Sequence, residues 1–202
     1  MKLYYSPGAC SLSAHIALQE AGLAFEPVKV NIRNHQLADG SDFYAINPLG
    51  YVPVLELDDG THLREGMAVV QYIADLAPNK NLAPANGTLA RHRLQEWLAF
   101  LGTEVHKSFG PLFNPATPEE TKTATKARLR TRFEWIDKEL EGKDYLGGEH
   151  FSVADGYLFT VSSWAKPTGL DLSGLTNLLA WQARTAARPA VEAAMKAEGL
   201  IK

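Results

Sequence analysis

The chain has 202 residues, one cysteine and a formal net charge of −3. A single cysteine excludes an intramolecular disulfide framework and a cysteine-rich zinc module, and it fits a reducing compartment. The slightly acidic balance offers no basic surface to a nucleic acid backbone, and no apolar run approaches the length of a membrane helix. We therefore expect a cytoplasmic protein of one large or two small domains, with neither nucleic acid nor membrane as a partner.

The first 80 residues alternate short strand patterns with helical ones. A helix that connects two strands implies a parallel pair, whereas the turn at Asp58-Asp59-Gly60 implies an antiparallel hairpin. We predict an α/β domain with a mixed sheet of four strands. The strands are predicted at 2–5, 25–30, 52–57 and 61–63, and the helical segments at 11–21, 35–45 (weakly) and 67–77.

Residues 78–87 have the Pro, Asn and Gly content of a linker, and the pattern after them is helical to the end. Ser152 and Asp155 have the spacing of a capping box at the start of one of these helices. The sequence therefore predicts two domains, an α/β domain over 1–79 and an all-α domain over 87–202. Two apolar stripes mark the helical core, one at Leu94, Leu98, Leu101 and Val105 and one at Leu129, Phe133, Ile136 and Leu140.

Cys10 follows a predicted strand and a Ser-Pro-Gly turn, and it precedes a predicted helix. At a helix N-terminus the free N–H groups and the helix dipole favour a thiolate, so Cys10 is a candidate nucleophile. The alternative is a buried, inert thiol, which is the commoner fate of a lone cysteine. Ser13 occupies the place of the second cysteine of a thioredoxin motif, so redox chemistry here would use one protein thiol.

The segment from Asn47 to Val54 leads into a predicted strand and contains Pro53, which cannot donate a ladder hydrogen bond. A cis Val52-Pro53 bond would turn the N–H and C=O of Val52 outward to pair with an extended peptide. A trans proline that opens an edge strand is the alternative, and it is the commoner isomer.

Glu65 and Gly66 lie where the last predicted strand gives way to a helix. The backbone N–H groups at a helix start attract a carboxylate, and the Glu65 side chain could accept a bond from an ammonium group. Together they could hold the head group of an α-amino acid. The alternative is that Glu65 is only a favourable acidic residue in a first helical turn.

His106 lies on the helix of the first stripe, next to a face of small residues that includes Ala99, Gly102 and Thr103. Small residues leave room for a ligand or for the close approach of another helix, and the sequence leaves both possibilities open. The other histidines have no metal-ligand spacing, so we expect no metal.

These segments together resemble the glutathione transferase superfamily, and most closely its bacterial beta class. The likeness covers the whole chain, because several independent motifs match in order. They are the opening residues 1–23 with Tyr-Ser-Pro-Gly-Ala-Cys-Ser-Leu-Ser, Asn47-Pro48-x-Gly50-x-Val52-Pro53, Arg64-Glu65-Gly66, the helical segments 104–109 and 151–155, and the ending 197–202.

The resemblance implies a thioredoxin-like N-terminal domain, an all-α C-terminal domain and a homodimer. The implied activity is transfer of glutathione, as co-substrate, to hydrophobic electrophiles. Glutathione would pair with Val52 next to Pro53 in the manner of a strand, and its γ-glutamyl end would meet Glu65 and Gly66.

The same resemblance implies that the glutathione sulfur lies near Cys10 and His106, which are the implied catalytic residues. Thr103 and Glu104 would belong to this site or to that of the partner subunit. His35 stands where the class usually carries a lysine for the glycyl carboxylate of glutathione. Two further departures, Ala99 for a frequent asparagine and Ala14 for a frequent proline, also concern binding strength more than reaction class.

A thiol is a weak hydrogen-bond donor, so Cys10 could instead form a mixed disulfide with glutathione, which would favour thiol transfer beside conjugation. Two other functions stay open. One is a non-catalytic protein of the same fold that binds glutathione or apolar ligands, and the other is a glutathione-dependent reductive dehalogenase or disulfide reductase. Aromatic candidates for the electrophile pocket are Tyr5, Phe109, Phe113 and Trp164.

Overall fold

The computed structural model describes all residues from 1 to 202. Its contacts divide the chain into two compact units, the first made of residues 1–83 and 187–202 and the second of residues 84–186. We expected 87–202 to form one helical domain, whereas the structure groups the last part of that range with the first unit. No helix is both long enough and apolar enough to cross a membrane.

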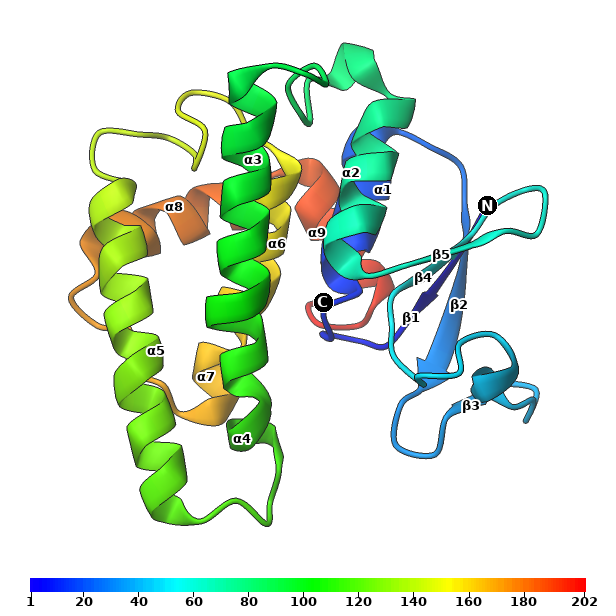
Figure 1. Cartoon of the computed structure of the whole chain (residues 1–202), viewed down its shortest axis with the longest axis horizontal. Helices are drawn as coiled ribbons and strands as arrows, with labels where there is room; N and C mark the ends of the chain where they lie inside the picture. Colours follow the sequence, from blue (N-terminus) through cyan, green and yellow to red (C-terminus); the bar gives the residue numbers. More distant parts are fainter. The chain divides into compact units, whose positions relative to one another are not determined.

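The first unit combines a sheet with three α-helices. Figure 1 shows its last helix, α9, beside its first, α1, although the two lie at opposite ends of the chain. Gly22 ends α1 in the left-handed conformation, as its position after the helical pattern predicts. The elements are β1 (Lys2–Tyr5), α1 (Leu12–Ala21), β2 (Glu26–Asn31), β3 (Gln36–Leu37), the 3-10 turn η1 (Phe43–Ala45), β4 (Val54–Glu56), β5 (His62–Arg64), α2 (Gly66–Leu76), η2 (Pro78–Lys80) and α9 (Pro189–Ala197).

The sheet has five strands in the order β3-β2-β1-β4-β5. β1 pairs in parallel with β2, and the other three pairs are antiparallel. The mixed, thioredoxin-like sheet is therefore confirmed, but the predicted number of four strands is wrong. The missed strand is β3, because two residues are too few to show an alternating pattern. The weak helix predicted over 35–45 is reduced to the turn η1.

Both faces of the sheet are covered. Leu3 and Leu55 are fully buried on one face, and Figure 1 shows α1 and α2 together on one side of the strands. Tyr4 is the next residue of β1, so its side chain points to the opposite face. There it belongs to an apolar cluster with Val30, Phe43, Val52 and Val54. The loop that leads into β4 is thereby anchored through Val52, one of the candidate site residues.

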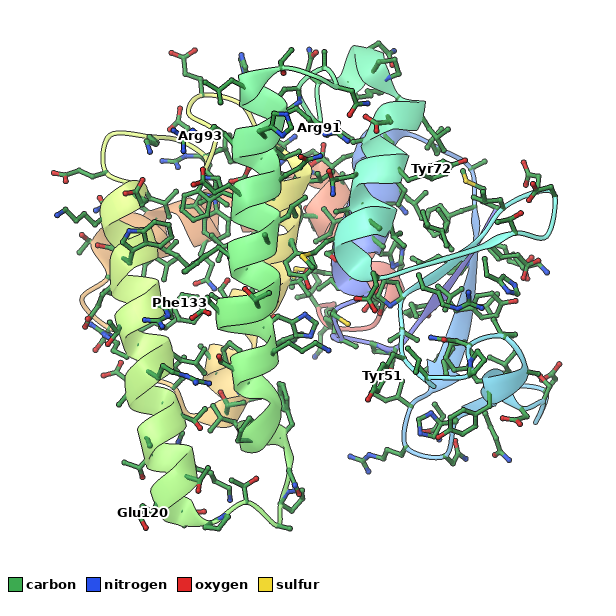
Figure 2. All side chains as sticks on the ribbon, viewed as in Figure 1. Tyr51, Tyr72, Arg91, Arg93, Glu120 and Phe133 are labelled. Atoms are coloured by element: carbon green, nitrogen blue, oxygen red, sulfur yellow. The ribbon has the colours of Figure 1, made fainter.

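The second unit is entirely helical. Both predicted stripes are buried, and Phe133 on α5, labelled in Figure 2, is fully enclosed. The helix of the first stripe does not stay α-helical, because residues 101–106 form a π-helical turn. The elements are α3 (Leu89–Phe100), the π turn η3 (Leu101–His106), the 3-10 turn η4 (Lys107–Phe109), α4 (Gly110–Phe113), α5 (Glu119–Glu139), α6 (Val153–Ser163), α7 (Ala165–Thr168) and α8 (Thr176–Ala186).

The predicted capping box at Ser152 and Asp155 is confirmed at the start of α6. Asp155 is completely buried and does more than cap the helix. It accepts hydrogen bonds from the Ser152 N–H at 2.9 Å, the Leu146 N–H at 2.9 Å and the Trp181 ring N–H at 3.0 Å. One carboxyl group therefore joins α6, α8 and the loop before α6. Burial raises the pKa of Asp155, and these donors act against that rise.

Candidate active site

Cys10 lies in a turn between β1 and α1, two residues before the helix begins. Its sulfur donates a hydrogen bond to the backbone carbonyl of Val52 at 3.0 Å. The carbonyl of Cys10 accepts from the N–H and the hydroxyl of Ser13, at 3.2 and 2.7 Å. The first turn of α1 therefore fixes the Cys10 backbone, and the thiol is half-buried against the loop that precedes β4.

The Val52-Pro53 peptide bond is cis. The carbonyl of Val52 accepts from Cys10, whereas its N–H has no partner within the chain. Of the two backbone groups expected to pair with an extended peptide, only the N–H is therefore unoccupied. Tyr51, labelled in Figure 2, is 63% exposed next to the buried Val52.

Glu65 and Gly66 form the junction between β5 and α2. Glu65 has a positive φ of 65°, and its carbonyl accepts from the N–H groups of Ala68 and Val69 at 2.9 Å. The N–H groups of Gly66 and Met67 have no partner within the chain, as expected for the first residues of a helix. The junction therefore offers an exposed carboxylate and two free N–H donors side by side.

Strand pairing brings these two segments together. Val54, the first residue of β4, pairs with Arg64, the last residue of β5. Pro53 and Glu65 are the next residues in this register, so they lie at the same end of the hairpin. The Cys10 sulfur reaches the same place through its contact with Val52. The structure thus gathers Cys10, Val52, Pro53, Glu65 and Gly66 at one end of the sheet.

His35 lies in the loop between β2 and β3 and has a positive φ of 55°. Its Nδ1 lies 3.2 Å from the carbonyl oxygen of Gly50, and its ring packs on Tyr44 with centroids 4.5 Å apart. Because a carbonyl only accepts, this bond requires the proton on Nδ1, which leaves Nε2 as the second polar atom of the ring. A Cβ on Gly50 would lie 2.7 Å from His35 Nδ1, so the ring sits directly on the glycine.

The second unit carries Thr103, Glu104 and His106, all on the π turn η3. Thr103 is exposed, and its hydroxyl donates to the carbonyl of Ala99 at 2.9 Å. Glu104 accepts two bonds on one oxygen from the guanidinium of Arg132 on α5, at 3.1 and 2.9 Å. π turns occur often at functional sites, since the extra residue turns side chains in a new direction.

His106 is half-buried, and its Nδ1 lies 2.7 Å from the hydroxyl of Tyr157 on α6. Its ring contacts that of Trp164 with centroids 5.0 Å apart. Burial and, to a lesser extent, the neighbouring charge of Lys107 lower the pKa of His106 to about 4. The imidazole is therefore neutral at pH 7, and it acts as a hydrogen-bonding group rather than as a cation.

The aromatic candidates differ in position. Phe113 is 52% exposed, and its ring contacts that of buried Trp164 at 5.5 Å. Phe109 is fully buried and also contacts Trp164 at 5.5 Å. Tyr5 belongs to the first unit, where burial and, secondarily, the charge of Glu198 raise its pKa. In the second unit, Phe113 is thus the aromatic candidate that presents an open apolar surface.

Sequence reasoning missed Tyr157 and Arg132, which hold His106 and Glu104. Tyr157 is 51 residues from His106 and Arg132 is 28 residues from Glu104, so no local spacing indicates these contacts. The hydrogen bond from the Ser13 hydroxyl to the Cys10 carbonyl was also missed, although a serine just inside a helix start commonly bonds to the preceding turn.

Two family models match the chain, glutathione S-transferase, N-terminal domain, over residues 1–75 and glutathione S-transferase, C-terminal domain, over residues 100–189. Glutathione S-transferase GstA of Escherichia coli O157:H7 is 45% identical over 200 residues, which span 99% of this chain and 100% of GstA. Glutathione S-transferase GST-4.5 of Xanthomonas campestris pv. campestris is 37% identical over 207 residues, with 99% and 100% of the two chains covered.

Solved structures agree with these relatives. BphK, a bacterial glutathione transferase solved as a ternary complex, has a TM-score of 0.97 and 54% identity, over 98% of this chain and 100% of its own. A sphingomonad glutathione S-transferase complexed with glutathione has a TM-score of 0.95 and 49% identity, over 100% of both chains. A beta-class enzyme of Sphingomonas chungbukensis has a TM-score of 0.96 and 49% identity, again over 100% of both. The resemblance seen in the sequence is confirmed, and the chain belongs to the glutathione transferase family.

Proposed function

We propose that this protein transfers glutathione to electrophilic small molecules, with glutathione as co-substrate and no metal. The observation that carries this proposal is the gathering of Cys10, Val52 and the Glu65-Gly66 junction at one end of the sheet, in a chain of the glutathione transferase family. These groups match the chemistry of a γ-glutamyl tripeptide, which has a peptide backbone, a thiol and a charged head group.

The head group fits the junction at the start of α2. The free N–H groups of Gly66 and Met67 suit its carboxylate, and the exposed carboxylate of Glu65 suits its ammonium group. The unpaired N–H of Val52 suits a backbone carbonyl of the tripeptide. The Nε2 atom of His35 is the group that we assign to the glycyl carboxylate, since Nδ1 is bound to Gly50.

The reaction is a nucleophilic displacement or addition by the glutathione sulfur. The thiolate forms a bond to the electrophilic carbon, and the thiol proton passes to solvent. In a displacement the leaving group departs with its electron pair, whereas in an addition the electron pair moves onto the electrophile, which then takes up a proton. A free thiol has a pKa near 8.5, so only about a few per cent is ionised at pH 7. Lowering this pKa by two units requires about 2.7 kcal/mol of differential stabilisation.

We assign Cys10 and His106 to the glutathione sulfur as a proposal, which the resemblance of their sequence segments to the family supports. Neutral His106 can donate one N–H bond to the thiolate if Nδ1 accepts from the Tyr157 hydroxyl. Thr103 and Glu104 lie on the same π turn and are proposed to complete this site or that of a second subunit in a homodimer. The exposed ring of Phe113 suits a hydrophobic electrophile.

A second activity is favoured by the half-buried thiol of Cys10, the only cysteine in the chain. Its thiolate would attack one sulfur of oxidised glutathione, the glutathione disulfide bond would break, and reduced glutathione would leave. The product is a mixed disulfide, and no second protein cysteine is present to resolve it. Thiol transfer would then need a further molecule of glutathione.

The test is a panel of electrophiles and disulfides with wild-type protein and Cys10→Ala. We expect wild type to conjugate glutathione to 1-chloro-2,4-dinitrobenzene and to gain one glutathionyl mass from oxidised glutathione. We expect Cys10→Ala to gain no glutathionyl mass but to keep some conjugating activity. Glutathione binding in calorimetry without turnover of any electrophile would instead support a binding protein, and absence of both would refute the proposal.

A further inference from the structure

Asn86 and Gly87 form an exposed dipeptide just before α3, in the second unit. It is the only place in the chain where glycine follows asparagine. The backbone nitrogen after an asparagine can attack the side-chain amide carbon, and glycine hinders this attack least because it has no Cβ. Three aspartates, whose carboxyl groups can undergo the matching reaction with loss of water, also precede glycine: Asp39, Asp59 and Asp155. The sequence alone does not choose among these four dipeptides.

The backbone at Asn86 and Gly87 is open to such an attack. The two residues are the centre of a turn, in which the N–H of Thr88 donates to the carbonyl of Ala85 at 3.4 Å. Gly87 has a φ of +80°, and a Cβ placed on it would meet no atom within 4 Å. The N–H of Gly87 donates no hydrogen bond to any other residue. Its nitrogen is therefore available as a nucleophile.

The glycines that follow the three aspartates are held differently. The backbone N–H of each donates to a carbonyl, from Gly40 to Leu37 at 3.1 Å, from Gly60 to Leu57 at 3.0 Å and from Gly156 to Ser152 at 3.3 Å. Each of these hydrogen bonds must break before the nitrogen can turn toward the preceding side chain. The folded structure therefore restrains the nucleophile at every candidate dipeptide except Asn86-Gly87.

The three aspartate side chains are also poor electrophiles. Asp39 accepts from the N–H and the hydroxyl of Ser41, at 2.9 and 2.6 Å, and Asp59 accepts from the N–H of Thr61 at 2.8 Å. These bonds lower the pKa of both carboxyl groups, so both are ionised at neutral pH, and a carboxylate is attacked less readily than a neutral amide. Asp155 is buried among its own donors. Nucleophile and electrophile thus favour the same dipeptide.

We propose that Asn86 is a site of spontaneous deamidation in the folded protein. The Gly87 nitrogen gives its proton to hydroxide and forms a bond to Cγ of Asn86. The amide nitrogen leaves with the electron pair of its bond to Cγ and takes up a proton, which releases ammonia. Water then opens the cyclic imide at one of its two carbonyl groups, so the products are aspartate and isoaspartate. This reaction needs only water and is independent of the proposed function.

The two products act differently on the start of α3. Thr88 caps this helix, because its hydroxyl accepts from the N–H of Arg91, labelled in Figure 2, at 3.2 Å and donates to the carbonyl of Ala85 at 2.7 Å. Aspartate adds a negative charge and leaves the backbone unchanged. Isoaspartate adds the same charge and also inserts the side-chain CH2 into the backbone between Ala85 and Thr88. It therefore displaces the cap from its turn.

The experiment incubates the folded full chain at pH 8.5 and follows tryptic peptides by chromatography and mass spectrometry. Cleavage after Lys80 and Arg91 releases residues 81–91, which contain Asn86 and, as an internal control, Asn81. We expect Asn86 to be converted to two acidic forms that separate on the column, while Asn81 keeps its amide because leucine follows it. A sample digested at time zero gives the background from digestion.

The three aspartates serve as the matched control. Residues 34–64 form one tryptic peptide with Asp39 and Asp59, and it should gain no isoaspartate while the chain is folded. In guanidinium chloride the same peptide should begin to gain isoaspartate, since unfolding breaks the bonds of Gly40 and Gly60. This contrast assigns the selectivity to the folded structure rather than to the sequence.

Asn86→Gln should abolish the acidic forms, because the longer side chain does not place its amide carbon for the same ring closure. Gly87→Ala should slow their formation severalfold, and Asn81→Gln should not change it. The proposal is overturned if Asn86 keeps its amide in the folded chain but loses it in guanidinium chloride. It is equally overturned if Asp39 or Asp59 forms isoaspartate in the folded chain as fast as Asn86. None of these measurements requires glutathione, so they stand whether or not the protein is a transferase.

Discussion

The two units hold their candidate site residues by different means. In the first unit the groups that suit glutathione are largely backbone groups, and strand pairing and turns position them, as with Val52 and Gly66. In the second unit the candidate groups are side chains on one π turn, and other side chains hold them, as Tyr157 holds His106. Backbone groups depend on the fold around them, whereas side-chain pairs depend on both partners. The first region should therefore resist surface substitutions that the second does not.

The largest expected effect comes from the side-chain framework of the second unit. Asp155→Ala leaves the N–H groups of Leu146, Ser152 and Trp181 without their buried acceptor. We expect a loss of about 3–5 kcal/mol in the free energy of unfolding, measured with urea. Asp171→Ala is the control, because this exposed aspartate caps only Ser173, and it should cost less than about 1 kcal/mol.

Glu65→Ala tests the one charged side chain that we assign to the glutathione head group in the first unit. The variant would leave the ammonium group of glutathione without its counter-charge, so binding should weaken by roughly 2–4 kcal/mol. Calorimetry measures this affinity. Glu120→Ala, which removes an exposed acid on α5 labelled in Figure 2, should bind like wild type. Equal affinities in the two variants would show that Glu65 is not the anchor.

The depressed pKa of His106 predicts a pH dependence of stability. Its pKa is about 4 in the folded protein, below the unfolded value near 6.5, so the unfolded state binds more protons between these values. This contribution is fully present above pH 6.5 and is lost as pH falls toward 4, by up to about 3 kcal/mol. Urea unfolding of wild type and His106→Gln at pH 7.5 and pH 5 should show a steeper acid loss in wild type. Parallel losses would contradict the assignment.

The smallest expected effect concerns the contact between the His35 ring and Gly50. Gly50→Ala places a Cβ 2.7 Å from His35 Nδ1 at a φ of +69°, whereas Gly60→Ala meets no atom within 4 Å at a φ of +83°. Both should lose about 1 kcal/mol from backbone strain. Only Gly50→Ala should also weaken glutathione binding, since the ring must move. A titration that gives the same affinity for both variants would separate His35 from the site.

How much could be predicted from the sequence follows the same division. Local patterns indicated β1, α1, the β4–β5 hairpin and the helix stripes, because each depends on residues a few positions apart. The segments around Cys10, Val52 and Glu65 were found for the same reason. The strand β3 was missed because it is defined by its partner, Val30 and Asn31, rather than by its own residues.

Long-range side-chain contacts account for the rest. The pairing of Glu198 with His15 spans 183 residues, and neither residue has a local pattern that indicates the other. In the sequence, Glu198 belongs to the ending 197–202, for which only a family resemblance was stated. The same lack of a local pattern holds for Arg132 and Glu104, which are 28 residues apart. Such contacts form only in the folded structure, and no spacing of residues in the sequence indicates them.

The inclusion of residues 187–202 in the first unit has a consequence for biosynthesis. Chains generally begin to fold from the N-terminus as they are synthesised. Here the sheet and α1 are translated before the second unit, but Glu198, whose carboxylate binds the N–H of Gly8 and Nδ1 of His15, is translated after it. The second unit is translated in between. The turn that carries the cysteine therefore acquires this partner only after the whole second unit has been translated, and the nascent chain keeps an unfinished thiol site until then.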